Sequence, residues 1–125
     1  MDGKIVKKDR KFYFNEGKFQ VKITDEMTPK LAPYEGKDVV FGIRSEDVYD
    51  KLFASEASPE NTVRATCEMV EPLGSEVYLH LNSGKHNFIA RVGAHDRPEV
   101  NRDMDLVLDM SKVHFFDPKT EETIV

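Results

Sequence analysis

The sequence predicts an all-β protein built from short antiparallel strands. Apolar and polar residues alternate with a period of two in five separate segments, which is the pattern of half-buried strands. Turn signals rich in Gly, Asn and Pro separate the segments, and no sustained helical repeat occurs in the 125 residues. Strands of this length and spacing are typical of a barrel or a sandwich.

The alternation also predicts which side chains are buried. The first segment runs from Lys18 to Ile23, and the others follow in chain order. The expected buried faces are Phe19, Val21 and Ile23; Val63, Ala65, Cys67 and Met69; Val77, Leu79 and Leu81; Phe88, Ala90 and Val92; and Leu106, Leu108 and Met110. The turns between them are expected at 15–17, 35–37, 72–74, 82–84 and 117–118.

Helix is expected only in short pieces. One such piece lies in 25–31. A second follows Arg44, where Ser45 is predicted to cap a turn that carries Glu46 and Asp47 in its first positions. Acidic residues are favoured there by the helix dipole.

The length corresponds to about one domain. Residues 54–61 are small, polar and contain Pro59, so they predict an exposed connector. The expected organisation is a single domain over 1–125, with two β lobes at about 1–53 and 62–125.

Composition restricts the functional classes. The formal net charge is −5, which disfavours nucleic-acid binding, because phosphate contacts need clustered Lys and Arg. No apolar run is long enough for a membrane helix, and the N-terminus lacks an export signal. The single cysteine, Cys67, excludes an internal disulfide and is compatible with a reducing cytoplasm.

No motif predicts catalysis. The four histidines, His80, His86, His95 and His114, lack metal-site spacing, and Cys67 alternates in phase with buried residues, which predicts a structural thiol. The phosphate-binding patterns G-x-x-x-x-G-K-[ST] and G-x-G-x-x-G are absent. We therefore expect no enzyme activity, no metal and no cofactor in this chain.

Three segments, taken in order, resemble a known family. They read V-V-F-G-I-R-S-E-D-V from Val39, E-M-V-E-P-L-G-S-E-V-Y-L-H-L from Glu68, and K-V-H-F-F-D-P-K-T-E-E-T-I from Lys112. Their order and spacing resemble the C-terminal regulatory region, called TOBE, of ATPase subunits of carbohydrate-uptake ABC importers of the maltose and glycerol-phosphate types. The resemblance implies an OB-fold-like antiparallel barrel of the TOBE type, with an additional small β lobe.

Two positions depart from the family pattern. Ser45 stands where the family usually has Pro, and Glu122 stands where it often has Gly. The nucleotide-binding half of such subunits has no counterpart in the sequence, so the chain resembles an excised C-terminal domain. ATP and Mg²⁺ would belong to that missing half.

The resemblance implies a regulatory and dimerisation role rather than catalysis. The implied partners are a twin ATPase subunit, the membrane subunits of the transporter and, in some members, a regulatory protein such as a phosphotransferase-system carrier. The implied location is cytoplasmic, on the inner face of the cell membrane.

Three groups of residues are candidate contacts with a partner or a dimer mate. The first is the corner formed by Glu71, Pro72, Gly74, Ser75 and Glu76. The second is Arg44, which could instead form a local salt bridge with Glu46 and Asp47. The third is the pair Phe115 and Phe116, whose side chains should point to opposite faces of a strand.

Two other functions remain open on the sequence. One is a stand-alone OB-like module that binds a small anion or a sugar. The other is a single-stranded nucleic-acid binder, for which Phe12, Tyr13 and Phe14 near several basic residues are suitable but the net charge is not.

Overall fold

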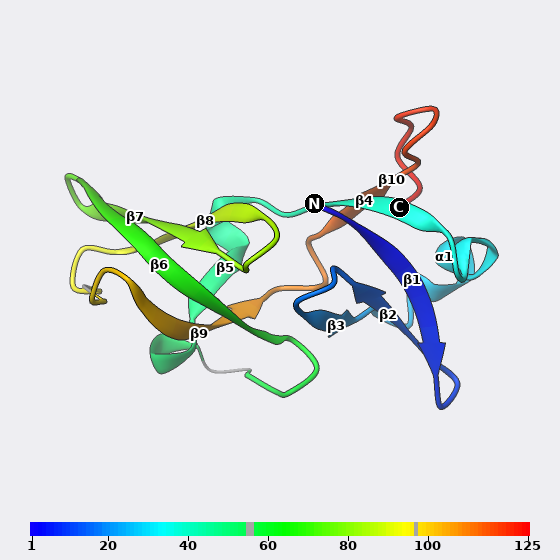
Figure 1. Ribbon diagram of the computed structural model, residues 1–125, viewed down its shortest axis with the longest axis horizontal. Helices are drawn as coiled ribbons and strands as arrows, with labels where there is room; N and C mark the ends of the chain where they lie inside the picture. Colours follow the sequence, from blue (N-terminus) through cyan, green and yellow to red (C-terminus); the bar gives the residue numbers. More distant parts are fainter. Residues whose placement is uncertain (55–56, 97) are drawn as a thin grey trace. The chain divides into compact units, whose positions relative to one another are not determined.

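The chain folds into two compact β-rich units, seen in a computed structural model that describes residues 1–54, 57–96 and 98–125. Unit 1 comprises Met1–Ile43 and Met110–Val125, and unit 2 comprises Arg44–Asp109. Strands predominate in both units and helix is limited to short turns (Figure 1), which confirms the predicted all-β class. No helix among the described residues has the length and apolar character needed to span a bilayer.

Unit 1 is a five-stranded antiparallel sheet in the order β10-β4-β1-β2-β3. A short α-helix and a 3₁₀ turn connect β3 to β4. The elements are β1 (Asp2–Lys8), β2 (Lys11–Asn15), β3 (Gln20–Lys22), α1 (Thr28–Leu31), η1 (Ala32–Tyr34), β4 (Asp38–Gly42) and β10 (His114–Phe116). The last residues of the chain return along β10, where the N–H of Ile124 donates to the carbonyl of Phe115 at 2.7 Å.

Three phenylalanines form the centre of unit 1. Phe14 on β2 stacks on Phe41 of β4 with ring centroids 4.8 Å apart. Phe115 of β10 contacts both, at centroid distances of 5.8 and 5.4 Å. All three are at most 2% exposed. Because each comes from a different strand, the cluster ties β10 to the centre of the sheet.

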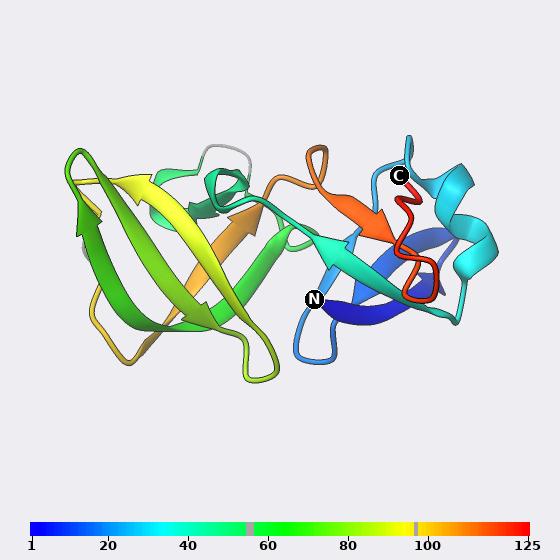
Figure 2. The ribbon, with the colours of Figure 1, turned by 90° about the horizontal axis from the view of Figure 1, so that it is seen from above.

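Unit 2 is a second antiparallel sheet, in the order β5-β9-β6-β7-β8. Figure 2 shows its strands curling around a common interior. The elements are η2 (Ser45–Asp47), β5 (Val48–Asp50), η3 (Lys51–Phe53), β6 (Thr62–Leu73), β7 (Glu76–Asn82), β8 (Asn87–Gly93) and β9 (Arg102–Leu108). The predicted inward residues of these strands are buried, except that Val92 is half-buried and Met69 is exposed.

Met69 is a wrong prediction with a clear cause. The register of β6 against β7 shifts between Cys67 and Met69, so that Cys67 lies opposite Leu81 while Met69 lies opposite His80. A β-bulge inserts one extra residue and moves the following side chains to the other face. Cys67 therefore stays fully buried, as expected, and Met69 is 47% exposed.

The helical turns are shorter than the sequence suggests. Within 25–31 only Thr28–Leu31 is α-helical, and η1 follows it directly. The turn at Ser45 is 3₁₀ and its N-cap residue is Arg44, without a side-chain cap bond. The predicted Ser45 cap is wrong, because Arg44 is the last residue with extended backbone (φ −81°, ψ 149°) and Ser45 is already the first residue of the turn.

The two units differ from the two lobes expected at about 1–53 and 62–125. The chain leaves unit 1 after Ile43 and returns to it at Met110. The reason is the pairing of β10 with β4, which places Phe115 opposite Phe41. The connector expected at 54–61 lies within unit 2, and Ser55 and Glu56 in it are outside the described residues.

Candidate functional site

The corner at Pro72–Glu76 is a tight β-hairpin between β6 and β7. Leu73 pairs with Glu76, so Gly74 and Ser75 form a two-residue turn. Gly74 has φ 72°, and Gly is preferred at the first central position of hairpin turns that need a positive φ. Pro72 lacks an N–H, but it lies beyond the part of β6 that pairs with β9, which ends at Cys67, so it removes no bond with that strand.

The residues of this corner belong to a larger surface. Beyond the bulge, alternate residues of β6 lie on the same side of the sheet as the outward residues of β7 and β8. We call this surface the β6–β7–β8 outer face. Its side chains are Met69, Glu71 and Leu73 of β6, Glu76, Tyr78 and His80 of β7, and Ile89 and Arg91 of β8.

The charged groups of the outer face are paired with one another. Glu71 Oε1 lies 3.0 Å from His80 Nε2. Arg91 contacts Glu46 of η2 at 2.9 Å and Glu76 at 3.5 Å. Exposed pairs of this kind contribute at most about 1 kcal/mol, so they orient the side chains more than they stabilise the fold.

Three large apolar side chains lie between these pairs. Met69, Leu73 and Ile89 are 47%, 48% and 38% exposed. Apolar groups bordered by charged ones are typical of surfaces that contact other proteins. The corner residues Glu71, Ser75 and Glu76 therefore form one end of a continuous candidate contact surface.

The other candidate residues lie apart from this face. Arg44 is exposed at the start of unit 2; of its two expected partners, Glu46 pairs with Arg91 instead and Asp47 is buried. Phe115 is buried in unit 1, whereas Phe116 is half-buried beside Gly42, where an added Cβ would lie 3.1 Å from its ring. The two aromatics do point to opposite faces, but Phe115 is a core residue.

A cavity in unit 2 brings together residues that the sequence did not single out. It has a volume of about 320 Å³, and its polar lining comes from Tyr49, Asp50, Glu76, Arg91, His95 and Asp96. Asp50 and Asp96 are 5% and 4% exposed. Burial and the adjacent Asp50 carboxylate raise the pKa of Asp96 to about 7. No local pattern indicated this pair, because the two residues come from opposite edges of the sheet.

Cys67 has the properties of a structural thiol. It is fully buried, and desolvation raises the pKa of its thiol, which disfavours the reactive thiolate. Within the described parts of the chain, no three His, Cys, Asp or Glu side chains are grouped to hold a metal ion.

The fold and its outer face define a class: a two-unit, all-β domain with a candidate contact surface. Residues 1–48 match the family model described as "MalK OB fold domain", and residues 57–115 match the model described as "TOBE domain". The chain thus belongs to the family of TOBE and MalK-type OB-fold domains, which confirms the resemblance predicted from the three motifs.

Curated relatives support the same assignment. The chain is 40% identical over 111 residues to the trehalose/maltose import ATP-binding protein MalK of Thermococcus litoralis, covering 86% of this chain and 30% of that protein. It is 37% identical to the oligosaccharides import ATP-binding protein MsmX of Bacillus subtilis, over 73% of this chain and 25% of the relative. It is also 37% identical to the multiple sugar-binding transport ATP-binding protein MsmK of Streptococcus mutans, over 98% and 31%. The chain thus spans less than a third of each of these relatives.

A solved structure shares the fold. The cytoplasmic molybdate-binding protein ModG matches with a TM-score of 0.68 over 94% of both chains, at 16% sequence identity. At that identity the likeness shows the fold alone.

Proposed function

We propose that these residues form the regulatory and dimerisation part of the ATP-binding subunit of an ABC importer for sugars or sugar derivatives. The single observation that carries the proposal is the pair of family matches, in order, over residues 1–48 and 57–115. The names of the three relatives, all ATP-binding proteins of sugar import, supply the substrate class.

In this proposal the chain does no chemistry of its own. ATP and Mg²⁺ bind in another part of the complete subunit, which carries a phosphate loop. The partners are a twin ATP-binding subunit, the membrane subunits of the importer and, in some settings, a regulatory protein. The subunit then works at the inner face of the cell membrane.

The β6–β7–β8 outer face is the surface that we assign to partner contact. It combines exposed Met69, Leu73 and Ile89 with charges that are already paired internally. Pairing lowers the cost of covering a charge, because each group keeps a counter-charge when water is removed.

Two measurements test the proposal. Titration calorimetry with ATP and Mg²⁺ should give no heat of binding to this chain, and micromolar binding would contradict a purely regulatory role. Sedimentation over a range of concentrations should show self-association that is weakened at least tenfold by Leu73→Arg combined with Ile89→Arg.

A matched control separates contact from general damage. Leu52 in η3 is 85% exposed and lies off the outer face, so Leu52→Arg should leave self-association unchanged. If Leu52→Arg weakens association as much as the double variant does, the outer face is not the contact surface.

A further inference from the structure

Two buried carboxyl groups face each other in unit 2. Asp50 is the last residue of β5, and Asp96 lies in the segment after β8. They are 5% and 4% exposed, and their side chains are within hydrogen-bonding contact of each other. Buried acids are uncommon in proteins unless they are paired with a suitable partner.

Among the described residues, one oxygen of the pair, Asp96 Oδ2, has no hydrogen-bond donor. Asp50 Oδ1 accepts the N–H of Leu52 at 3.0 Å. The N–H of Asp96 donates to the carbonyl of Gly93 at 3.0 Å, but its Oδ2 is buried without any donor in the part of the chain that the structure describes. A proton held between the two carboxyl groups resolves this, because a protonated Asp96 can donate to Asp50.

The arginine among the described residues of the cavity wall is paired with other carboxylates. Arg91, across the cavity, already contacts Glu46 and Glu76. Burial raises the pKa of the Cys67 thiol on β6, and the nearby Asp96 and Asp50 carboxyl groups raise it further. The remaining titratable groups on the cavity wall are Tyr49 and His95.

We propose that Asp50 and Asp96 form a proton-operated latch that ties the segment 94–96 to the end of β5. With one shared proton, the pair is a hydrogen bond that holds this wall of the cavity closed. When the proton leaves, two negative charges are in contact in a buried site, and the segment separates from β5. The inference is independent of the proposed function, because it uses only contacts within unit 2.

The pH range follows from the sign of the linkage. The pKa of Asp96 is raised from 3.8 to about 7 by burial first and by Asp50 second. A carboxyl group whose pKa is raised on folding binds its proton more tightly in the folded state. The contribution of the latch to stability therefore decreases as pH rises from about 4 towards 7, and the latch is open above that range.

Amide hydrogen exchange of this chain at pH 5.5 and pH 8.5 tests the latch. Protection factors, corrected for intrinsic exchange rates, should fall at least tenfold at pH 8.5 for the amides of Leu52 and Asp96. The amide of Leu79 in the middle of β7 should change less. An equal fall at Leu79, or no fall at Leu52 and Asp96, would overturn the local opening.

Variants identify the group that titrates. In Asp96→Asn a neutral amide can donate to Asp50 at either pH, so the difference in protection at Leu52 should disappear. Asp50→Asn should also remove the pH difference in protection at the Asp96 amide, since the new amide can donate to an ionised Asp96. If Asp96→Asn does not fold, the Asp50→Asn variant identifies the titrating group. His95→Gln is the matched control and should retain the difference.

A carbon-detected NMR titration gives an independent result. In the wild type, the side-chain carboxyl of Asp96 should titrate with a midpoint near neutrality. In Asp50→Asn, the proton affinity of the same carboxyl should be at least tenfold lower. A midpoint near 4 in the wild type, or a pH effect that persists in Asp96→Asn and is lost in His95→Gln, overturns the proposal.

Discussion

Adjacent aromatic residues occupy different environments at Phe115 and Phe116. Phe115 is 0% exposed and contacts the rings of Phe14 and Phe41, whereas Phe116 lies half-buried on the other face of β10. The alternation of a strand predicted this opposition correctly. It could not predict which of the two enters the core, because that depends on pairing with β4.

We expect Phe115→Ala to lower the free energy of unfolding of unit 1 by about 3–5 kcal/mol, because it empties the centre of an aromatic cluster. Phe116→Ala is the matched control and should cost clearly less, since its side chain is only half-buried. Guanidinium unfolding curves of both variants would measure the difference. Equal costs would mean that the two faces of β10 are packed alike.

Asp117 makes the stability of unit 1 depend on pH in the acidic range. The N–H of Lys119 first, then the Tyr34 hydroxyl at 3.0 Å and the N–H of Thr120, hold the pKa of Asp117 below its usual value. A carboxyl group whose pKa is lowered on folding contributes stability at pH values above its unfolded pKa of 3.8. That contribution is lost as the pH falls through the lower pKa of the folded state.

Asp117→Asn should therefore reduce the loss of stability between pH 7 and pH 3. Urea midpoints for unit 1 over this range, compared with those of Asp25→Asn, would measure it. Asp25 is 97% exposed in its side chain, so its variant should follow the wild type. If Asp117→Asn also follows the wild type, these hydrogen bonds do not select the ionised form.

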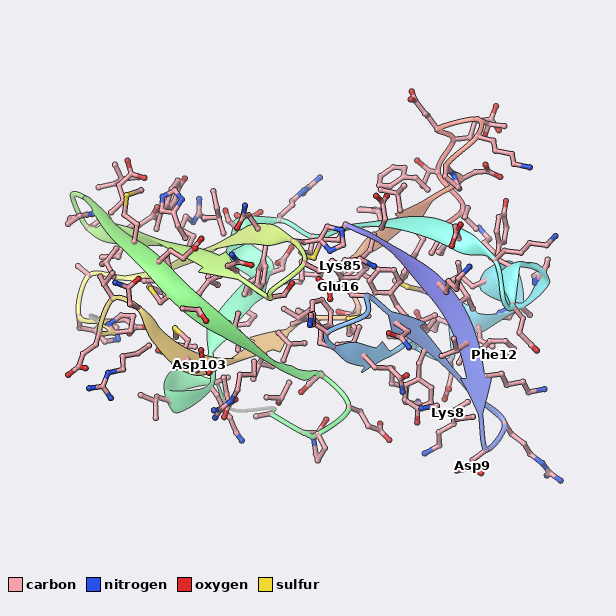
Figure 3. All side chains as sticks on the ribbon, in the orientation of Figure 1. Lys8, Asp9, Phe12, Glu16, Lys85 and Asp103 are labelled. Atoms are coloured by element: carbon pink, nitrogen blue, oxygen red, sulfur yellow. The ribbon has the colours of Figure 1, made fainter. Side chains whose placement is uncertain are left out.

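At the scale of elements, the β1–β2 hairpin contains an unfavourable turn. Lys8 pairs with Lys11, leaving Asp9 and Arg10 as the two turn residues, with φ of 50° and 68°. Figure 3 shows Asp9 at the tip of this hairpin, beyond Lys8. Two positive φ values are the signature of a type I′ turn, which prefers Asn or Asp followed by Gly. Arg10 has the wrong side chain for its position.

Arg10→Gly should raise the free energy of unfolding by about 0.5–1 kcal/mol, because removing Cβ relieves the left-handed conformation. Thermal unfolding monitored in unit 1 would detect it. Lys8→Gly, in extended backbone one residue before the turn, should instead destabilise. A loss of stability in Arg10→Gly would mean that the arginine side chain makes a contribution larger than the strain.

Strand β6 shows how far periodicity can be read from a sequence. Val63, Ala65 and Cys67 are buried as the alternation predicts, and the pattern of apolar residues continues to Met69. The bulge after Cys67 moves the following side chains to the opposite face of the sheet. The residues at the bulge, Glu68 and Met69, contain no Gly or Pro that would indicate it in the sequence. The outer face could therefore not be assembled from sequence, although its corner, Glu71 to Glu76, was recognised from the turn residues and the family motif.

For the molecule as a whole, the all-β class and the family were predictable, whereas the division into units was not. The class depends on local periodicity. The division depends on β10 pairing with β4 and on contacts such as Arg91 with Glu46, which join positions far apart along the chain. The Asp50–Asp96 pair is hidden for the same reason, since neither residue stands out among 23 acids.

A chain that ends after Asp109 should keep unit 2 folded and lose unit 1, because unit 1 would lack β10 and the Phe115 ring. Two-dimensional amide NMR would show dispersed signals for residues 44–109 only. Ending the chain after Thr120 is the control, since it keeps β10. Dispersed signals from residues 1–43 in the shorter chain would contradict this dependence.

The return of the chain to unit 1 has a consequence for folding during synthesis on the ribosome. Residues 44–109 are contiguous, so unit 2 can fold as soon as Asp109 has left the exit tunnel. Unit 1 begins first yet must wait for Phe115, which is six residues beyond Asp109 and follows it by about 0.3–1.2 seconds at synthesis rates of roughly 5–20 residues per second. During the synthesis of unit 2 and this further interval, β4 lacks its neighbour β10, so the edge of the nascent sheet at β4 is unpaired. A chaperone that covers unpaired strand edges of nascent chains would bind there, on the first strands of unit 1 rather than on unit 2.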